Sequence, residues 1–306
     1  MSRRVLFIDV PGAIVYKSAT DRGLTALPPY ENMGRWGFKI RYLCHLLHLD
    51  AVAPCSQINH EITEQDADKI VIIGSVIYEA FIRQLREAFP AAEIGYYYDN
   101  VVRDGASISP AVLRKYDVTP YSWDTKDCAR YGMTYQKPAF QRTVLGENKI
   151  IPAWDICFIG RDKGRYKQVM SLKESFQQLG IRAYIRLIAD FSFTRFFRTQ
   201  YSDPISYQEY LDVVSDSKAL LDLVQRGQVG PTRRVMEAIF SGKKLVTNNT
   251  DLVNSDLYCP DNIFILGQDP IEQLPAFLAS PFRPLSEEVL NSYSMENRIT
   301  ELSSDD

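Results

Sequence analysis

Short apolar runs alternate with helical patterns along both halves of the chain. In the first half the predicted strands are 4–10, 69–74, 93–98 and 117–122, and the predicted helices are 37–49, 76–89, 109–115 and 124–131. Strands that are apolar along their whole length belong to parallel sheets with both faces covered by helices. The first half is therefore predicted to form a Rossmann-like α/β domain.

The alternation stops at 137–154, where Pro138 and Pro152 lie in a stretch with little periodicity, and then resumes. The later predicted strands are 155–160, 182–188, 218–224, 244–247 and 262–267, with helices at 166–179, 206–215, 231–241 and 270–278. This pattern predicts an α/β fold of two Rossmann-like lobes, 1–150 and 151–280, whose parallel sheets face a central cleft. In the remaining segment, 281–306, a predicted helix at 286–302 would pack back on the first lobe.

The composition is that of an ordinary globular enzyme. The chain has 306 residues and a net charge of −3, which gives no electrostatic reason to expect a nucleic acid partner. Its five cysteines have no CxxC spacing, as in a protein of the reducing cytoplasm. Asp9 and Pro11 interrupt the apolar start, so we interpret it as a strand and not as a signal peptide. We expect a cytoplasmic protein.

One stretch, 225–247, has the pattern of a helix start that binds an anion. Gly230 lies where the helix would begin, Pro231 suits the first helical position, and Gly242 suits a left-handed end. Four polar residues then surround the first turns: Thr232, Arg233, Arg234 and Glu237. Amides, a hydroxyl and guanidinium groups suit a diphosphate, and a carboxylate suits the hydroxyls of a ribose.

This stretch resembles the donor-nucleotide motif of bacterial GT-B glycosyltransferases, two-domain enzymes that build surface polysaccharides. The residues that carry the resemblance are Gln228, Gly230, Thr232, Arg234, Glu237, Ala238, Gly242, Lys243 and Lys244. The resemblance implies that Glu237 binds the donor ribose, that the turn and helix start hold the diphosphate, and that no metal is needed. Many retaining members have two glutamates in this motif, and Val229 stands where the first would fall. Retention and inversion therefore both stay open.

A basic loop follows the first strand of the second lobe. It contains Gly160, Arg161, Lys163 and Arg165. Glycine permits close approach of a ligand, and three cations would neutralise a diphosphate. GT-B enzymes have a basic loop at this point, so the resemblance implies a second part of the donor site. The alternative is a solvated strand–helix turn.

Two segments of the first lobe are candidates for the acceptor side. Gly34 and Gly37 permit close backbone approach, and Trp36, which follows Arg35, could stack on a sugar ring. A glycine turn with Trp36 in the core is the alternative.

Asp99 and Asn100 follow a predicted strand, so they would reach the rim of the cleft. If the enzyme inverts, Asp99 is the candidate general base toward an acceptor hydroxyl, with Asp9 and Asp104 as rivals. The alternative is that these residues only form the turn after the strand.

Metal sites have little support in the sequence. The DxD sequence 66–68 precedes a predicted strand, which places it at the amino edge of the sheet, away from a cleft. Cys44 and His48 are spaced i, i+4, but no further ligand completes a zinc site. We expect no metal and no cofactor.

The sequence thus predicts a metal-independent glycosyltransferase of surface polysaccharide or lipopolysaccharide assembly. It would move a sugar from a nucleotide sugar, preferably a UDP-sugar, to a hydroxyl of a growing lipid-linked glycan. The basic and aromatic stretch 182–201 suits peripheral contact with the cytoplasmic face of the inner membrane. The alternatives are another Rossmann-type nucleotide-dependent enzyme and a two-lobed nucleotide- or sugar-binding module without catalysis.

Overall fold

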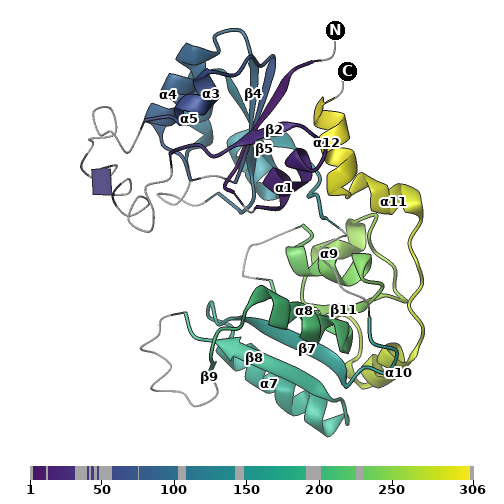
Figure 1. Cartoon of the computed structure of the whole chain (residues 1–306). Coiled ribbons are helices and arrows are strands. Elements are labelled where there is room, and N and C mark those ends of the chain that lie inside the picture. The colour runs from purple at the N-terminus through teal and green to yellow at the C-terminus, as the bar shows by residue number, and fades with distance from the viewer. Residues whose placement is uncertain are drawn as a thin grey trace. The chain divides into compact units, whose positions relative to one another are not determined.

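The chain forms two compact units, which the computed structural model in Figure 1 shows. The structure describes residues 3–11, 13–31, 40, 43–44, 47, 57–74, 76–102, 108–141, 148–190, 201–224 and 230–303. The first unit comprises Met1–Ala139 and Ser292–Asp306, and the second comprises Phe140–Asn291. Each unit is built on one parallel sheet.

The sheet of the first unit has six strands in the order β2-β1-β3-β4-β5-β6, all parallel. Its strands are β1 (Val5–Ile8), β2 (Thr25–Leu27), β3 (Lys69–Ile73), β4 (Glu93–Tyr98), β5 (Val118–Ser122) and β6 (Thr134–Tyr135). Its helices are α1 (Ile14–Thr20), α3 (His60–Thr63), α4 (Glu79–Ala88), α5 (Pro110–Lys115), α6 (Thr125–Tyr131) and α12 (Met295–Ser303). Asp124 caps α6 by accepting hydrogen bonds from the amides of Lys126 and Asp127.

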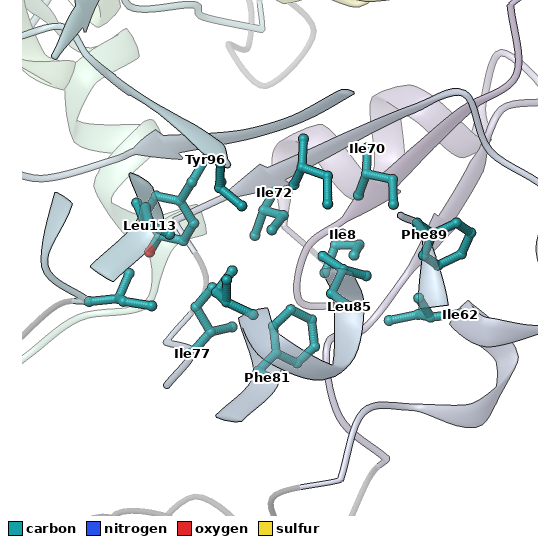
Figure 2. Close-up of a cluster of buried hydrophobic side chains, with 14 of the residues drawn as sticks. Ile8, Ile62, Ile70, Ile72, Ile77, Phe81, Leu85, Phe89, Tyr96 and Leu113 are labelled. Atoms are coloured by element: carbon teal, nitrogen blue, oxygen red, sulfur yellow. The ribbon is translucent and has the colours of Figure 1, made fainter. Parts of the chain in front are cut away.

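Helices cover both faces of this sheet (Figure 1). On one face, side chains of α3, α4 and α5 pack against alternate residues of the central strands, and Figure 2 shows Ile8, Ile70 and Ile72 beside Phe81 and Leu85. On the other face, β1 and β3 pack against α1 and α12. The alternation of faces along each strand explains why nearly every strand position is apolar.

The second unit repeats this plan with the strand order β12-β11-β10-β7-β8-β9, all parallel. Its strands are β7 (Trp154–Arg161), β8 (Ala183–Ile188), β9 (Tyr201–Ser202), β10 (Ser217–Asp222), β11 (Lys244–Thr247) and β12 (Ile263–Ile265). Its helices are α7 (Tyr166–Gln178), α8 (Tyr207–Ser215), α9 (Arg233–Phe240), the 3-10 turns η4 (Thr250–Asn254) and η5 (Ile271–Gln273), α10 (Leu274–Ala279) and α11 (Glu287–Ser292). Two parallel sheets in α/β units confirm the predicted fold class.

Several details differ from the sequence-based expectations. Helix α3 was not predicted, and the single helix expected at 286–302 is two helices, α11 and α12. α1 and β2 lie where the sequence suggested only a long loop after the first strand. The short edge strands β6 and β9 were not predicted. The helix expected to begin at Pro231 begins at Arg233, because the hydroxyl of Thr232 accepts a hydrogen bond from the Val235 amide at 3.3 Å and so makes Thr232 the N-cap. Gly242, with φ of 65°, follows the end of this helix as predicted.

Candidate functional site

The carboxyl ends of β7, β10 and β11 meet at one edge of the second sheet, because these strands are parallel neighbours. Polar groups lie there, at the strand ends where ligands of open α/β sheets bind. Asp222 ends β10, Thr247 ends β11, and Arg161 ends β7. The N-terminus of α9 approaches the same edge, since Thr232 contacts Asp222.

Asp222 is the buried centre of this edge. Its Oδ1 accepts a hydrogen bond from the Thr232 hydroxyl at 3.0 Å, and its Oδ2 accepts one from Thr247 at 3.3 Å. Nη1 of Arg234 lies 3.6 Å from Asp222 Oδ1. Burial raises the pKa of Asp222, and Arg234 and the two hydroxyls oppose that rise. The same Thr232 hydroxyl donates to Asp222 and accepts from the Val235 amide at the start of α9. Both hydrogen bonds therefore stabilise the fold of this edge.

Two arginines lie beside the ring of Phe158. The guanidinium carbons of Arg165 and Arg234 lie 5.5 and 5.1 Å from the centre of the Phe158 ring. Gly160 lies beside both guanidinium groups. A Cβ there would lie 3.4 Å from Arg234 Nη2, 3.6 Å from Arg165 Nη2 and 3.3 Å from Phe158 Cζ. The sequence-predicted residues Gly160, Arg165 and Arg234 therefore form one cluster, and we call its two cations the arginine pair.

Backbone carbonyl oxygens, which are uncharged, hold the guanidinium group of Arg165 in position. Its guanidinium donates hydrogen bonds to the carbonyl oxygens of Arg161, Asp162 and Leu223. Among the described residues, no carboxylate forms an ion pair with it. Burial and the nearby Arg234 lower the pKa of Arg165. The arginine pair thus places two cations beside the buried Asp222, and the charges of both arginines lower the pKa of that carboxyl against the effect of burial.

Arg234 is anchored more directly than Arg165. Its Nη2 donates to the Ile159 carbonyl at 2.6 Å. Burial opposes its ionisation, but Tyr210, Asp222 and Glu237 together hold its pKa above the ordinary value. Both arginines are fixed by the backbone ends of β7 and β10, so their guanidinium groups are oriented before any ligand arrives.

Glu237 lies one turn further along α9 and is only 3% exposed. Its carboxylate accepts a hydrogen bond from the Tyr210 hydroxyl and lies 3.3 Å from Arg233 Nε. Burial raises its pKa, while Tyr210, Arg233 and Arg234 oppose the rise. Of these two partners, Arg233, with a side chain 55% exposed, is the one at the surface, so a ribose hydroxyl would approach Glu237 from that side.

The other predicted donor-site residues lie around this cluster. Arg161 donates to the carbonyls of Ala189 and Asp190, and the exposed Lys163 adopts a φ of 46° with its amide bonded to Asp190. Gly230 has a φ of 80°, which favours glycine, and its carbonyl accepts a bond from Asn249.

Lys243 and Lys244 of the motif are buried and donate to groups of the second unit. Lys243 Nζ donates to the carbonyls of Ser215 and Ser217, and Lys244 Nζ to the Asp261 carbonyl and the Ser280 hydroxyl. Both side chains therefore serve the packing of the second unit.

In the first unit, acidic residues gather at the carboxyl ends of β1 and β4. Asp99 and Asn100 are exposed after β4, and a Cβ on Gly74 would clash with the Asp99 carboxylate. Asp9, after β1, is 4% exposed and accepts hydrogen bonds from the amides of Val10 and Tyr16. Burial raises the pKa of Asp9 to about 7 despite those bonds, and the charge of Asp99 adds to the rise.

Several predicted features lie outside the described residues. They are Gly34, Arg35, Trp36, Gly37, Asp104, Gln228, Val229, most of the helix at 37–49 and the basic and aromatic residues within 191–200. In the described part of the chain, no group of three His, Cys, Asp or Glu residues is placed to hold a metal ion. None of the described helices combines the length and apolarity that crossing a bilayer requires.

Asp222 and Tyr210 were not singled out from the sequence. An acid at the end of an apolar strand is a recognisable signal for Asp222, because the carboxyl ends of parallel strands gather ligand-binding groups. Tyr210 follows no motif, since its role depends on how α8 and α9 pack.

No protein-family model matches the sequence, and no curated protein matches it. Solved structures do match over nearly the whole chain. AviGT4, a glycosyltransferase involved in avilamycin A biosynthesis, is 17% identical with a TM-score of 0.54, covering 98% of this chain and 97% of its own. A sucrose-phosphate synthase from Thermosynechococcus elongatus is 10% identical with a TM-score of 0.58, covering 97% of each chain.

Two further matches were solved with nucleotide ligands. Anabaena HepE in complex with UDP and glucose is 10% identical with a TM-score of 0.52, covering 98% of each chain. The UDP-GlcNAc 2-epimerase of Methanocaldococcus jannaschii, in complex with UDP-GlcNAc and UDP, is 10% identical with a TM-score of 0.50, covering 97% of this chain and 98% of its own. With two six-stranded parallel sheets in successive α/β units, the chain has the GT-B glycosyltransferase fold.

Proposed function

We propose that the protein is a glycosyltransferase that binds the diphosphate of a nucleotide sugar at the arginine pair. The observation that carries the proposal is the arginine pair beside the Phe158 ring, where Arg165 and Arg234 are oriented by carbonyl groups. Preorganised guanidinium groups recognise phosphate oxygens by charge-assisted hydrogen bonds. Gly160 and Gly230 let a ligand approach the backbone, and the exposed Arg161, Lys163 and Arg233 would extend the positive field.

In this mechanism the arginine pair stabilises the leaving group. The bond between the anomeric carbon and the diphosphate oxygen breaks, and its electron pair goes to that oxygen. Arg165 and Arg234 are placed to meet the charge that develops there, as a metal would in other transferases. Glu237 would accept hydrogen bonds from the ribose hydroxyls in exchange for its contact with Arg233.

On the acceptor side, Asp99 is the proposed general base. An acceptor hydroxyl attacks the anomeric carbon and gives up its proton to Asp99, which is exposed at the end of β4. The carboxylates of Asp99 and Asp9 repel each other, because the charge of Asp99 raises the pKa of Asp9. Asn100 and the 34–36 segment would complete the acceptor contacts.

The proposed donor is supported by neighbours in fold, and the proposed acceptor by the resemblance in the sequence. We propose a UDP-sugar as donor, because two neighbours in fold were solved with UDP. We propose a lipid-linked surface glycan as acceptor and peripheral contact with the cytoplasmic face of the membrane. The basic and aromatic stretch 182–201 supports that contact.

A panel of UDP-, GDP-, dTDP- and CMP-sugars tests the proposed function. The wild-type protein is expected to release free nucleotide from one donor, with the sugar appearing on an added acceptor. Glu237→Gln removes the ribose-binding charge and is expected to raise KM for that donor by about 10-fold, the value of one charge-assisted hydrogen bond. Glu79→Gln, which removes an exposed carboxylate of the first unit, serves as the control. Equal KM values in both variants would remove Glu237 from the site.

Epimerisation is the second candidate, because one matching structure is a UDP-GlcNAc 2-epimerase. That reaction rearranges the sugar of the nucleotide sugar itself and needs no second sugar. Incubation with UDP-GlcNAc alone, followed by analysis of the sugar products, separates the two activities. A 2-epimer formed without acceptor would favour the epimerase.

A further inference from the structure

Two adjacent isoleucines in the loop 148–153 of the second unit are almost fully exposed. Ile150 is 98% exposed and Ile151 is 87% exposed, more than any other large apolar side chain of the described residues. The loop leads into β7, whose first residue is paired with the first residue of β10, so it lies at the amino edge of the sheet. The donor site lies at the carboxyl edge. We call Ile150 and Ile151 the isoleucine tip.

Hydrogen bonds on both sides of the tip fix the loop to the chain just before β10. Ahead of the tip, the Lys149 amide donates to the Ser215 carbonyl at 3.1 Å. Behind it, the Ala153 amide donates to Asp216 Oδ1 at 2.8 Å, and the Trp154 amide donates to the Asp216 carbonyl at 3.1 Å. The backbone on both sides therefore holds the two isoleucines in an exposed position.

Three cations beside the tip cover two carboxylates. Lys149 Nζ lies 2.7 Å from Asp216 Oδ2. Lys218 Nζ and Arg182 Nη2 lie 2.8 and 3.1 Å from Asp155 Oδ1. The side chains of the three cations are 58%, 40% and 54% exposed, whereas those of the two carboxylates are 18% and 16% exposed. The groups of these ion pairs that face the solvent are therefore the cations.

We propose that the isoleucine tip inserts into the interface of a membrane that contains anionic lipids, with Lys149, Arg182 and Lys218 at the lipid phosphates. The aliphatic side chains would leave water for the boundary of the acyl chains, while the long cationic side chains keep their charged ends among the head groups. Trp154 follows the tip, and its ring meets that of Tyr184 edge-on at 5.3 Å. Tryptophan and tyrosine are enriched at the membrane–water interface.

A bilayer suits the tip better than a second protein does. Two side chains offer much less than the about 800 Å² per partner that a stable protein interface buries. A fluid bilayer needs no matching shape, and its anionic head groups attract exposed lysine and arginine. The inference rests on the membrane contact of the proposed function and not on the donor site, because that site lies at the opposite edge of the sheet.

Sedimentation of the full-length protein with lipid vesicles tests this inference. Wild type is expected to bind vesicles of equal parts phosphatidylglycerol and phosphatidylcholine, and to bind vesicles of phosphatidylcholine alone more weakly. The double variant Ile150→Ser, Ile151→Ser is expected to bind the mixed vesicles about 10-fold or more weakly, as loss of two inserted aliphatic side chains implies. Its Tm should equal that of wild type, because both side chains are exposed.

Matched variants make the result specific. Val253→Ser changes an exposed aliphatic residue of η4, which follows the carboxyl end of β11, and should bind vesicles as wild type does. Lys149→Gln should weaken binding about 5-fold at low salt, the contribution of one cation near an anionic surface. Lys173→Gln, at an exposed position of α7, should leave binding unchanged.

A tryptophan at the tip reports whether it enters the bilayer. The emission that Ile151→Trp adds to that of wild type should be quenched by lipids brominated in their acyl chains. An added emission that these lipids do not quench would contradict insertion.

Three further outcomes would overturn the inference. Equal vesicle binding by wild type and the double serine variant would assign the membrane contact to another surface. No vesicle binding by wild type would also remove membrane contact from the proposed function. A wild-type dimer that the double serine variant does not form would assign the tip to a second copy of the chain. UDP binding, measured in the same samples, should be equal in both proteins, so a failure of the donor site is seen separately.

Discussion

Replacing Arg234 with methionine is expected to lower kcat/KM for the donor by about 10²- to 10³-fold, as loss of one preorganised charge donor does in other enzymes. Methionine has a similar length and removes the guanidinium that lies over Phe158 and bonds to the Ile159 carbonyl. Steady-state kinetics with the donor identified in the panel measures the effect.

Loss of fold must be separated from loss of chemistry, because Arg234→Met leaves the buried Asp222 without its cation. Arg234→Met combined with Asp222→Asn removes both charges, and the amide oxygen of the new side chain keeps acceptor capacity for Thr232 and Thr247. This double variant should recover stability while turnover stays low. Arg182→Met breaks an arginine–aspartate pair at the opposite end of the same sheet and should leave kcat/KM unchanged. Recovery of turnover together with stability would assign Arg234 a purely structural role.

Replacing Asp9 with asparagine is expected to stabilise the first unit above neutral pH. The pKa of Asp9 is raised to about 7 in the folded chain, against about 3.9 when unfolded. Between these values the folded state binds one more proton than the unfolded state, so the free energy of unfolding falls as pH rises. The fall is roughly 1.4 kcal/mol per pH unit, or about 4 kcal/mol in total, and is complete above about pH 7.

Asparagine is always neutral and can still accept the amide hydrogen bond from Val10. Asp9→Asn should therefore abolish that slope and exceed wild type by about 2–4 kcal/mol at pH 8, with near equality at pH 4. Urea unfolding at several pH values measures it. Asp21→Asn, at an exposed carboxylate of the same unit, should follow the wild-type pH dependence. A wild-type stability that does not fall between pH 4 and pH 7 would contradict the burial of an ionisable Asp9.

The buried strands were predictable because they are short apolar runs between polar breaks. The strands Glu93–Tyr98 and Lys244–Thr247 have the predicted bounds. The edge strands β2, β6 and β9 have only two or three residues, and a pattern that short has no measurable period. Helix α1 has seven residues and no side-chain cap, so nothing local in the sequence marks its start.

The sequence indicated which segments form the candidate site, but not which contacts their side chains make. The motif at 225–247 and the basic loop identified the correct sheet edge for Arg165 and Arg234, since both segments follow strands of one parallel sheet. That Arg165 donates to carbonyls, that Tyr210 covers Glu237, and that Thr232 caps α9 depend on packing between distant segments.

The affinity difference between a nucleoside diphosphate and its nucleoside tests the diphosphate site most directly. Calorimetric titrations of UDP and uridine, or of the GDP or dTDP pair if that base is preferred, isolate the contribution of the diphosphate. Wild type is expected to bind the diphosphate at least about 10²-fold more tightly, as two charge-assisted contacts imply. In the Arg165→Met, Arg234→Met double variant the ratio should fall close to one. An undiminished ratio in that variant would contradict the assignment of the diphosphate to the arginine pair.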